Sequence, residues 1–213
     1  MYLSKLSLDV SSPSVAQALA SSHDMHRNLM KAFDHNHAIP DRERENIGLL
    51  YRIVQKKKDA PVLYVQSIEK PYWERIALNG YHLCGMNYNL EKEMEHFLNG
   101  SQWRFSILAF PSKKVKTIGQ KNSRRQLLTG NRERLSWLTK QGENNGFSIV
   151  SATETPEQEK TELAKKSGSF FLSGVRYDGI LRITDEEKFR TAFEKGIGPE
   201  KAYGYGLLMI AKA

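Results

Sequence analysis

Hydrophobic positions in the first half of the chain recur in patterns that predict a series of strands and helices. Apolar residues alternate over residues 2–10, which predicts a strand, and recur at helical spacing from about residue 21 to residue 34. Two runs rich in branched and aromatic residues, 49–55 and 62–68, predict two further strands. Shorter helices are expected to begin at Ser12 and near Pro71, and the pattern over 81–90 is ambiguous.

A similar series is predicted for the second half. The apolar runs 103–110, 147–151, 170–175, 180–183 and 207–210 indicate strands, and helices are expected over 131–142 and 185–195. Thr184 and Glu187 indicate a capping box at the start of the last helix, and Gly196 stands where that helix should end. The basic segment 111–130 is expected to be a loop, and the charged segment 153–168 a loop or a hairpin arm.

This order of elements predicts an α+β protein. Each half follows the order strand, helix, strand, strand, helix, strand, so two βαββαβ units in tandem are the simplest architecture. Each unit would form an antiparallel sheet with helices on one side. We place the domains at residues 1–97 and 101–213 from the order of elements, because the two halves share no repeated sequence.

The composition is that of a globular protein from a reducing compartment. Hydrophobic residues make up 39% of the 213 residues, which is enough for packed cores. Cys84 is the single cysteine, so the chain cannot form an internal disulfide. No apolar run approaches the roughly 20 residues of a membrane span, and the first residues lack the pattern of a signal peptide. A soluble cytoplasmic protein without a membrane partner is therefore expected.

The positive charge is concentrated in one stretch. The net charge is +8, and residues 1–100 contribute none of it. Residues 101–134 contain a single acid, Glu133, against nine basic side chains. The nine are Arg104, Lys113, Lys114, Lys116, Lys121, Arg124, Arg125, Arg132 and Arg134. Because a solvated surface usually mixes both signs, this stretch indicates a polyanion, and nucleic acid is favoured over an anionic membrane since no basic amphipathic helix accompanies it.

A glycine-rich loop separates the last helix from the last strand. It contains Gly196, Gly198, Gly204 and Gly206 together with Lys201 and two tyrosines. Glycine lets a backbone approach a ligand closely and adopt positive φ. Because a strand follows, the order differs from that of a dinucleotide-binding loop, and the Gly-Lys-Ser/Thr of a P-loop is missing. A cradle for an RNA backbone is favoured over a nucleotide pocket, and a simple flexible turn is the alternative.

The helix predicted from Ser21 separates two kinds of side chain. On a helical wheel, His23 and Arg27 lie opposite the apolar face, His26 lies on the border beside His23, and Lys31 follows Arg27 by four residues. The helix N-terminus adds free N–H groups and a positive dipole, which would stabilise a phosphate. The apolar face, which should pack inward, consists of Met25, Leu29, Ala32 and Phe33.

Three interpretations of the two histidines compete. They could bind a metal ion, although no third ligand is apparent among His35, His37, His82 and His96. His26 could instead be a half-buried side chain without a chemical role. The third interpretation is acid–base catalysis, because histidine exchanges protons near neutral pH and RNA supplies its own nucleophile, the 2′-hydroxyl. A ribonuclease of this kind needs no metal.

Together, these segments resemble the CasE family, the CRISPR-associated endoribonucleases that process repeat RNA within the type I-E Cascade complex. The resemblance spans nearly the whole chain. It rests on the strand from Tyr2, the Met25-His26-Arg27-x-Leu29-x-Lys31 run, the strand over 61–66, the Trp137-Leu138 helix and the Gly196–Gly206 loop.

The resemblance implies a fold and a reaction. The fold would be two tandem ferredoxin-like (RRM-like) domains. The reaction would be cleavage of CRISPR repeat RNA at the base of its stem-loop, without metal or cofactor, leaving a 2′,3′-cyclic phosphate and a 5′-hydroxyl. The enzyme would keep its product, so the crRNA stem-loop and the other Cascade subunits are the implied partners.

The resemblance also implies roles for individual residues. His26 corresponds to the family's catalytic histidine and Lys31 to a lysine that assists at the phosphate. His23 stands where relatives often have tyrosine, so it either replaces that phenol in proton transfer or only positions the RNA. Lys201 matches the basic residue of the glycine loop. Further RNA contacts are expected from Arg27, Lys113, Lys114, Lys116, Lys121, Arg124, Arg125, Lys165 and Lys166, for which a solvated charge is the alternative.

Two rival functions stay open on the sequence. One is a non-catalytic subunit of the same fold that binds structured RNA, and His26 and Lys31 are the features that argue against it. The other is a ribosome- or tRNA-associated protein, which would use the basic segment alone and bind generic structured RNA. An enzyme with a small-molecule substrate lacks any cofactor motif to support it.

Overall fold

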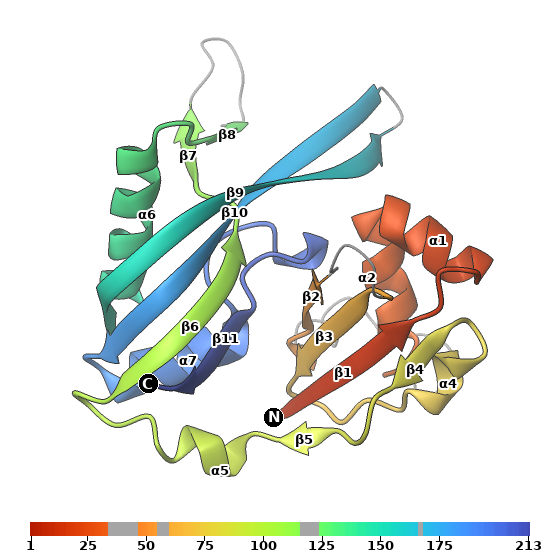
Figure 1. The fold of residues 1–213 in the computed structure, drawn as a ribbon, viewed down its shortest axis with the longest axis horizontal. Helices are drawn as coiled ribbons and strands as arrows, with labels where there is room; N and C mark the ends of the chain where they lie inside the picture. The colour runs from red at the N-terminus through yellow and green to blue at the C-terminus, as the bar shows by residue number, and fades with distance from the viewer. Residues whose placement is uncertain (34–46, 55–59, 116–123, 166–167) are drawn as a thin grey trace.

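The computed structural model contains two main antiparallel sheets, each built by one half of the chain, and a separate two-stranded hairpin in the second half (Figure 1). It describes residues 1–33, 47–54, 60–115, 124–165 and 168–213. The N-terminal half forms the sheet on the right of Figure 1, and the C-terminal half forms the sheet on the left.

Alternating burial defines the central strand of the first sheet. Along β1 (Tyr2–Leu8), Ser4, Leu6 and Leu8 are buried on one face, while Lys5 between them is exposed. The neighbours of β1 are β3 and β4, β2 pairs with the outer side of β3, and the short β5 also pairs with β1. Their bounds are β2 (Leu50–Val54), β3 (Val62–Ser67), β4 (Tyr81–Leu83) and β5 (Tyr88–Asn89).

The second sheet repeats the connectivity of the first. Its order in space is β11, β6, β10, β9, where the first sheet has β4, β1, β3, β2. In both sheets the fourth main strand therefore lies beside the first, and every pairing is antiparallel. This is the ferredoxin-like arrangement, so the predicted fold class is confirmed. The bounds are β6 (Gln102–Ala109), β9 (Phe147–Lys165), β10 (Gly168–Ile183) and β11 (Leu208–Lys212).

Each sheet has its own helices and its own hydrophobic core. The first core joins β1 and β3 to α1 (Pro13–Ala20), α2 (Ser22–Met30) and α4 (Glu74–Ala77). The second joins β6 and β10 to α6 (Asn131–Asn144) and α7 (Glu186–Lys195). Phe97, which follows the short α5 (Glu91–Met94), belongs to the second core. The segment that links the two halves is thus anchored in the second one.

Two polar segments of the second half form strands, where the sequence predicted a loop for one and a loop or a hairpin arm for the other. Within the expected loop 111–130, β7 (Ser112–Val115) and β8 (Arg124–Leu127) form an antiparallel hairpin. The segment 153–168 is the hairpin arm, the second of the two expectations, because β9 and β10 stay paired from Phe147–Ile183 to Lys165–Gly168. These segments are rich in polar and charged residues, so the hydrophobic pattern does not mark their strands.

Helix ends agree with the sequence at α2 and differ at α7. The backbone N–H of Asp24 donates to the Ser21 side chain at 3.3 Å, which confirms the predicted start of α2. The cap of α7 is Asp185 and not Thr184, since the Asp185 carboxylate accepts from the Lys188 N–H at 3.0 Å. Aspartate has the stronger preference for this position. No helix in the described part of the chain is long and apolar enough to cross a membrane.

Candidate functional site

Helix α2 presents its charged residues and His23 on the side away from the core, as predicted. His23, Arg27 and Lys31 are exposed, and His26 is half-buried. The opposite side fills the first core because its residues recur at helical spacing. These buried residues are Met25 and Leu29 on the helix, and Ala32 and Phe33 just after it.

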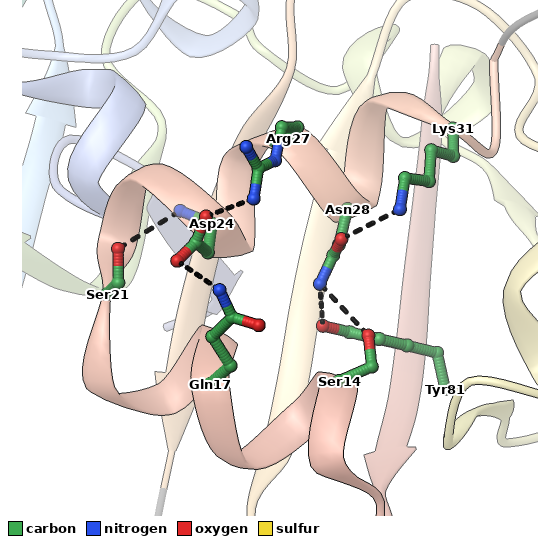
Figure 2. A network of polar contacts seen from close by, with 8 residues as sticks. All are labelled: Ser14, Gln17, Ser21, Asp24, Arg27, Asn28, Lys31 and Tyr81. Carbon is green, nitrogen blue, oxygen red and sulfur yellow. Dashed lines mark hydrogen bonds and ion pairs between the residues drawn. The ribbon is translucent and has the colours of Figure 1, made fainter.

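Arg27 is held by Asp24 of the same helix, and Asp24 is in turn held by the preceding helix. Its guanidinium lies 2.5 Å from the Asp24 carboxylate, one helical turn earlier (Figure 2). Asp24 also accepts a hydrogen bond at 3.1 Å from the Gln17 amide of α1. Because Asp24 offsets its charge, the Arg27 guanidinium is an oriented hydrogen-bond donor more than an isolated cation.

Lys31 is oriented by a buried amide. Its ammonium donates to the Asn28 side-chain oxygen at 3.1 Å (Figure 2). The Asn28 nitrogen donates in turn to the hydroxyls of Tyr81 at 3.3 Å and Ser14 at 3.2 Å. Burial raises the pKa of the Tyr81 hydroxyl, so that group stays protonated and neutral. The network therefore fixes Asn28 with its oxygen toward Lys31.

The glycine-rich loop after α7 has the backbone conformation that its composition predicts. Gly196, Gly198, Gly204 and Gly206 all have positive φ, between 73° and 87°. A side chain at Gly206 would lie 2.7 Å from the carbonyl oxygen of Ile197, and the Ile197 N–H donates to the Gly206 carbonyl at 3.0 Å. Glycine is required there because the two arms of the loop touch through their backbones.

The fold brings this loop to the first turn of α2. The tip of the loop, the short 3₁₀ helix η1 (Lys201–Tyr203), lies beside α2 and strand β2 (Figure 1). The buried hydroxyl of Tyr51, from β2, is 3.2 Å from the Ser22 carbonyl of α2 and 3.1 Å from the Ala202 carbonyl of η1. The start of the histidine helix and the tip of the glycine loop, which were predicted separately, are therefore brought together at the junction of the two sheets.

Lys201 is the cation of this loop. Its side chain is half-buried, and the pKa of its ammonium is lowered, chiefly by desolvation and also by the nearby charge of Lys195. A bound anion would act in the opposite direction and raise this pKa, because an opposite charge favours the charged form of the ammonium.

The predicted basic residues of the second half do not all gather at α2. The β7–β8 hairpin lies at the far side of the second sheet from α2 (Figure 1). On it, Lys113 is 3.7 Å from Glu133, and Lys114 stands opposite Arg125. The β9–β10 arm is placed differently, because its strand β9, which ends at Lys165, lies beside α2. Lys116, Lys121 and Lys166 are outside the described residues, and Arg124 lies on β8.

Comparison with known proteins decides the family. A family model described as CRISPR associated protein matches residues 1–212, which is nearly the whole chain. This chain belongs to the CRISPR-associated protein family. The resemblance drawn from the α2 and glycine-loop residues is thereby confirmed.

Relatives share the fold over their full lengths. The chain is 28% identical over 224 residues to the CRISPR-associated endoribonuclease Cse3 of Thermus thermophilus, covering 99% of this chain and 100% of that protein. It matches the structure of Cse3 bound to a 19-nucleotide RNA with a TM-score of 0.84 and 25% identity, covering 99% and 100% of the two chains. A chain of a CRISPR RNA-guided surveillance complex matches with a TM-score of 0.73 and 25% identity over 100% of both.

Several residues of this family member have roles that its sequence did not reveal. Asn28, Tyr51 and Tyr81 were not singled out, because each looks like an ordinary helix or strand residue. Arg134 stood in the basic stretch, yet it forms a bidentate ion pair with Glu154, and their side chains are only 13% and 7% exposed. That pair holds α6 to β9, so Arg134 is a structural residue.

Two other features lie apart from the site. A cavity of about 370 Å³ lies between the sheets, and none of the predicted site residues lines it. Its walls include Leu3, Gln66, Phe97 and strand β11. Among the residues that the structure describes, no group of three or more histidine, cysteine or acidic side chains is arranged to hold a metal ion.

Proposed function

We propose that this CRISPR-associated protein is an endoribonuclease that cleaves CRISPR repeat stem-loop RNA and stays bound to the mature product as a Cascade subunit. The observation that carries the proposal is the meeting of α2, with its histidines and Lys31, and the glycine loop with Lys201. The relatives support it, since one is named an endoribonuclease, one is a complex with RNA and one belongs to a surveillance complex. The protein works in the cytoplasm in this proposal, and its two domains are residues 1–97 and 101–213.

The proposed reaction uses the RNA's own 2′-hydroxyl and needs no metal. A base removes the 2′-hydroxyl proton, the oxygen attacks the adjacent phosphorus, and the bond to the 5′-oxygen breaks as an acid protonates that oxygen. The products are a 2′,3′-cyclic phosphate and a 5′-hydroxyl. His26 is the principal proton-transfer residue, and His23 either shares that role or positions the RNA. Lys31, oriented by Asn28, stabilises the negative charge that develops on the phosphate oxygens.

The remaining cations bind the RNA around the scissile phosphate. Lys201 and the backbone of Gly196, Gly198, Gly204 and Gly206 contact phosphates near the cut, and Arg27 contacts the strand along α2. The stem is held by Lys165 and Lys166 of the arm and by the basic residues of the β7–β8 hairpin and the segment it encloses. These basic residues are Lys113, Lys114, Lys116, Lys121, Arg124 and Arg125.

Cleavage in the presence of a chelator tests the function. Purified protein incubated with its host's repeat transcript and excess EDTA should cut once, at the base of the stem-loop, at the rate seen without EDTA. The new ends should carry a cyclic phosphate and a 5′-hydroxyl, which end-labelling and mass spectrometry distinguish. Tight binding without cleavage would mean a non-catalytic RNA-binding subunit, and a strict metal requirement would favour His23 and His26 as ligands.

Neutralising one hairpin lysine should weaken RNA binding by an electrostatic route. Lys114→Ala should raise Kd for the stem-loop and lower the slope of log Kd against log salt by about 1, the value for one phosphate contact. Lys114 is the sharper choice because Lys113 is close to Glu133. Lys140→Ala, an exposed lysine of α6 outside the predicted set, is the matched control and should leave the slope unchanged. Equal slopes for the two variants would place the stem away from the hairpin.

A further inference from the structure

One phenol joins the two halves of the site. The Tyr51 side chain is 1% exposed, and its hydroxyl lies between two backbone carbonyls, 3.2 Å from that of Ser22 and 3.1 Å from that of Ala202. These carbonyls belong to α2 and to the tip of the glycine loop, which are distant in sequence and lie in different halves of the chain. Both are acceptors, so the hydroxyl is the donor and shares its single proton between them.

The two carbonyls sit next to the residues proposed to carry the chemistry. Ser22 precedes His26 by four residues, so in an α-helix its carbonyl also accepts the backbone N–H of His26. Ala202 directly follows Lys201. The position of the Tyr51 hydroxyl therefore determines how far the turn that bears His26 stands from the loop that bears Lys201.

The surroundings of Tyr51 keep this contact in place. A side chain at Gly204 would lie 3.0 Å from the Tyr51 ring, so glycine there lets the loop close onto the ring. Desolvation raises the pKa of Tyr51 far above its usual value, so the hydroxyl keeps its proton. Two other side chains of the first sheet reach the second half of the chain, Arg52 to Ser106 of β6 at 2.8 Å and Gln66 to the Phe193 carbonyl of α7 at 2.6 Å. The sheets would thus stay together without the Tyr51 hydroxyl.

We propose that Tyr51 is a positioning residue for RNA cleavage, which holds the α2 turn of His26 and the Lys201 loop at the separation that the scissile phosphate requires. It does not touch the RNA, and it acts through two backbone carbonyls. The inference rests on the proposed ribonuclease function. Because a misplacement of about 1 Å costs up to about 100-fold in rate, loss of this one hydroxyl should affect the chemical step more than binding or folding.

The test is Tyr51→Phe against a matched variant, Tyr177→Phe. Tyr177 is equally buried, and its hydroxyl donates to the Arg134 carbonyl at 3.2 Å, away from α2. Single-turnover cleavage at saturating protein should be about 10- to 100-fold slower for Tyr51→Phe and unchanged for Tyr177→Phe. Kd for a repeat RNA with a 2′-deoxy substitution at the mapped cut should change by less than about threefold in both. Rates are measured well below the melting temperature of each variant.

A second pair of variants tests the same contact without altering the phenol. Gly204→Ala places a methyl group against the Tyr51 ring, whereas Gly100→Ala, at a similar positive φ, meets nothing within 4 Å. Slower cleavage by Gly204→Ala and not by Gly100→Ala, at an unchanged Kd for the 2′-deoxy RNA, supports the proposal even if Tyr51→Phe folds poorly. Equal rates for Tyr51→Phe and Tyr177→Phe would overturn it, as would a loss of RNA binding that accounts for the slower cleavage. Failure of the unmodified protein to cleave would instead refute the ribonuclease function.

Discussion

Replacing His26 by alanine is expected to lower the rate of RNA cleavage by about 10²–10⁴-fold, the usual cost of losing one general acid or base. The half-buried His26 lies on α2, the helix that meets the glycine loop, three residues after the exposed His23 and five before Lys31. RNA binding should stay nearly intact, because the neighbouring cations make most of the phosphate contacts. Single-turnover cleavage and Kd for the 2′-deoxy repeat RNA measure the two effects separately.

His82→Ala is the control for this experiment. His82 is an exposed histidine of β4, in the same half of the chain as His26 but outside the site. Its loss should change neither the cleavage rate nor the affinity for RNA. His23→Ala separates its two proposed roles: a fall in rate at constant Kd indicates proton transfer, whereas a rise in Kd indicates RNA positioning. Cleavage by His26→Ala at the original rate would remove this imidazole from the mechanism.

Truncating Phe97 should give the largest loss of stability. The ring is fully buried, with its centroid 5.4 Å from that of Trp103, 5.0 Å from Phe189 and 5.1 Å from Phe193, all edge to face. Phe97→Ala removes the buried ring with its three aromatic contacts and leaves a cavity. It should therefore lower the free energy of unfolding by about 3–5 kcal/mol. Urea unfolding followed by circular dichroism and tryptophan fluorescence gives the value.

The neighbouring residue provides the control for Phe97. Leu98 is 54% exposed, so Leu98→Ala should change the free energy of unfolding by no more than about 0.5 kcal/mol. If Phe97→Ala lowered the free energy of unfolding no more than Leu98→Ala does, the packing of Phe97 in the second core would not stabilise the protein. The test also bears on the predicted domain boundary, because Phe97 was placed at the end of the first domain and packs with residues of the second.

The sequence predicted most of the elements because most of them face a core. Met25 and Leu29 recur at helical spacing and are buried, and Leu6 and Leu8 alternate along β1. The β7–β8 hairpin was missed and the β9–β10 arm was left ambiguous because segments 112–127 and 153–168 are mostly polar or charged and show no apolar alternation. The predicted capping residue of the last helix, Thr184, was wrong, because the adjacent Asp185 caps α7 instead.

The candidate site was predicted in two separate parts, and the contact between them was not. The histidine helix and the glycine loop each have a local pattern, in residue type and in spacing. Tyr51 has none, because an aromatic residue in an apolar strand is ordinary until the loop from the other sheet is placed against it. Asn28 is similar, since its role depends on Tyr81, which lies in a different part of the chain.

The pairing of β11 with β6 has a kinetic consequence. Leu208 lies opposite Ile107, so the ladder joins two strands that are about 100 residues apart in the sequence. Contacts of such long range form slowly. The Gly206 N–H extends the same ladder to the Leu108 carbonyl at 2.8 Å. We therefore expect refolding to restore helix content first and the ability to cut RNA only in a later, slower phase.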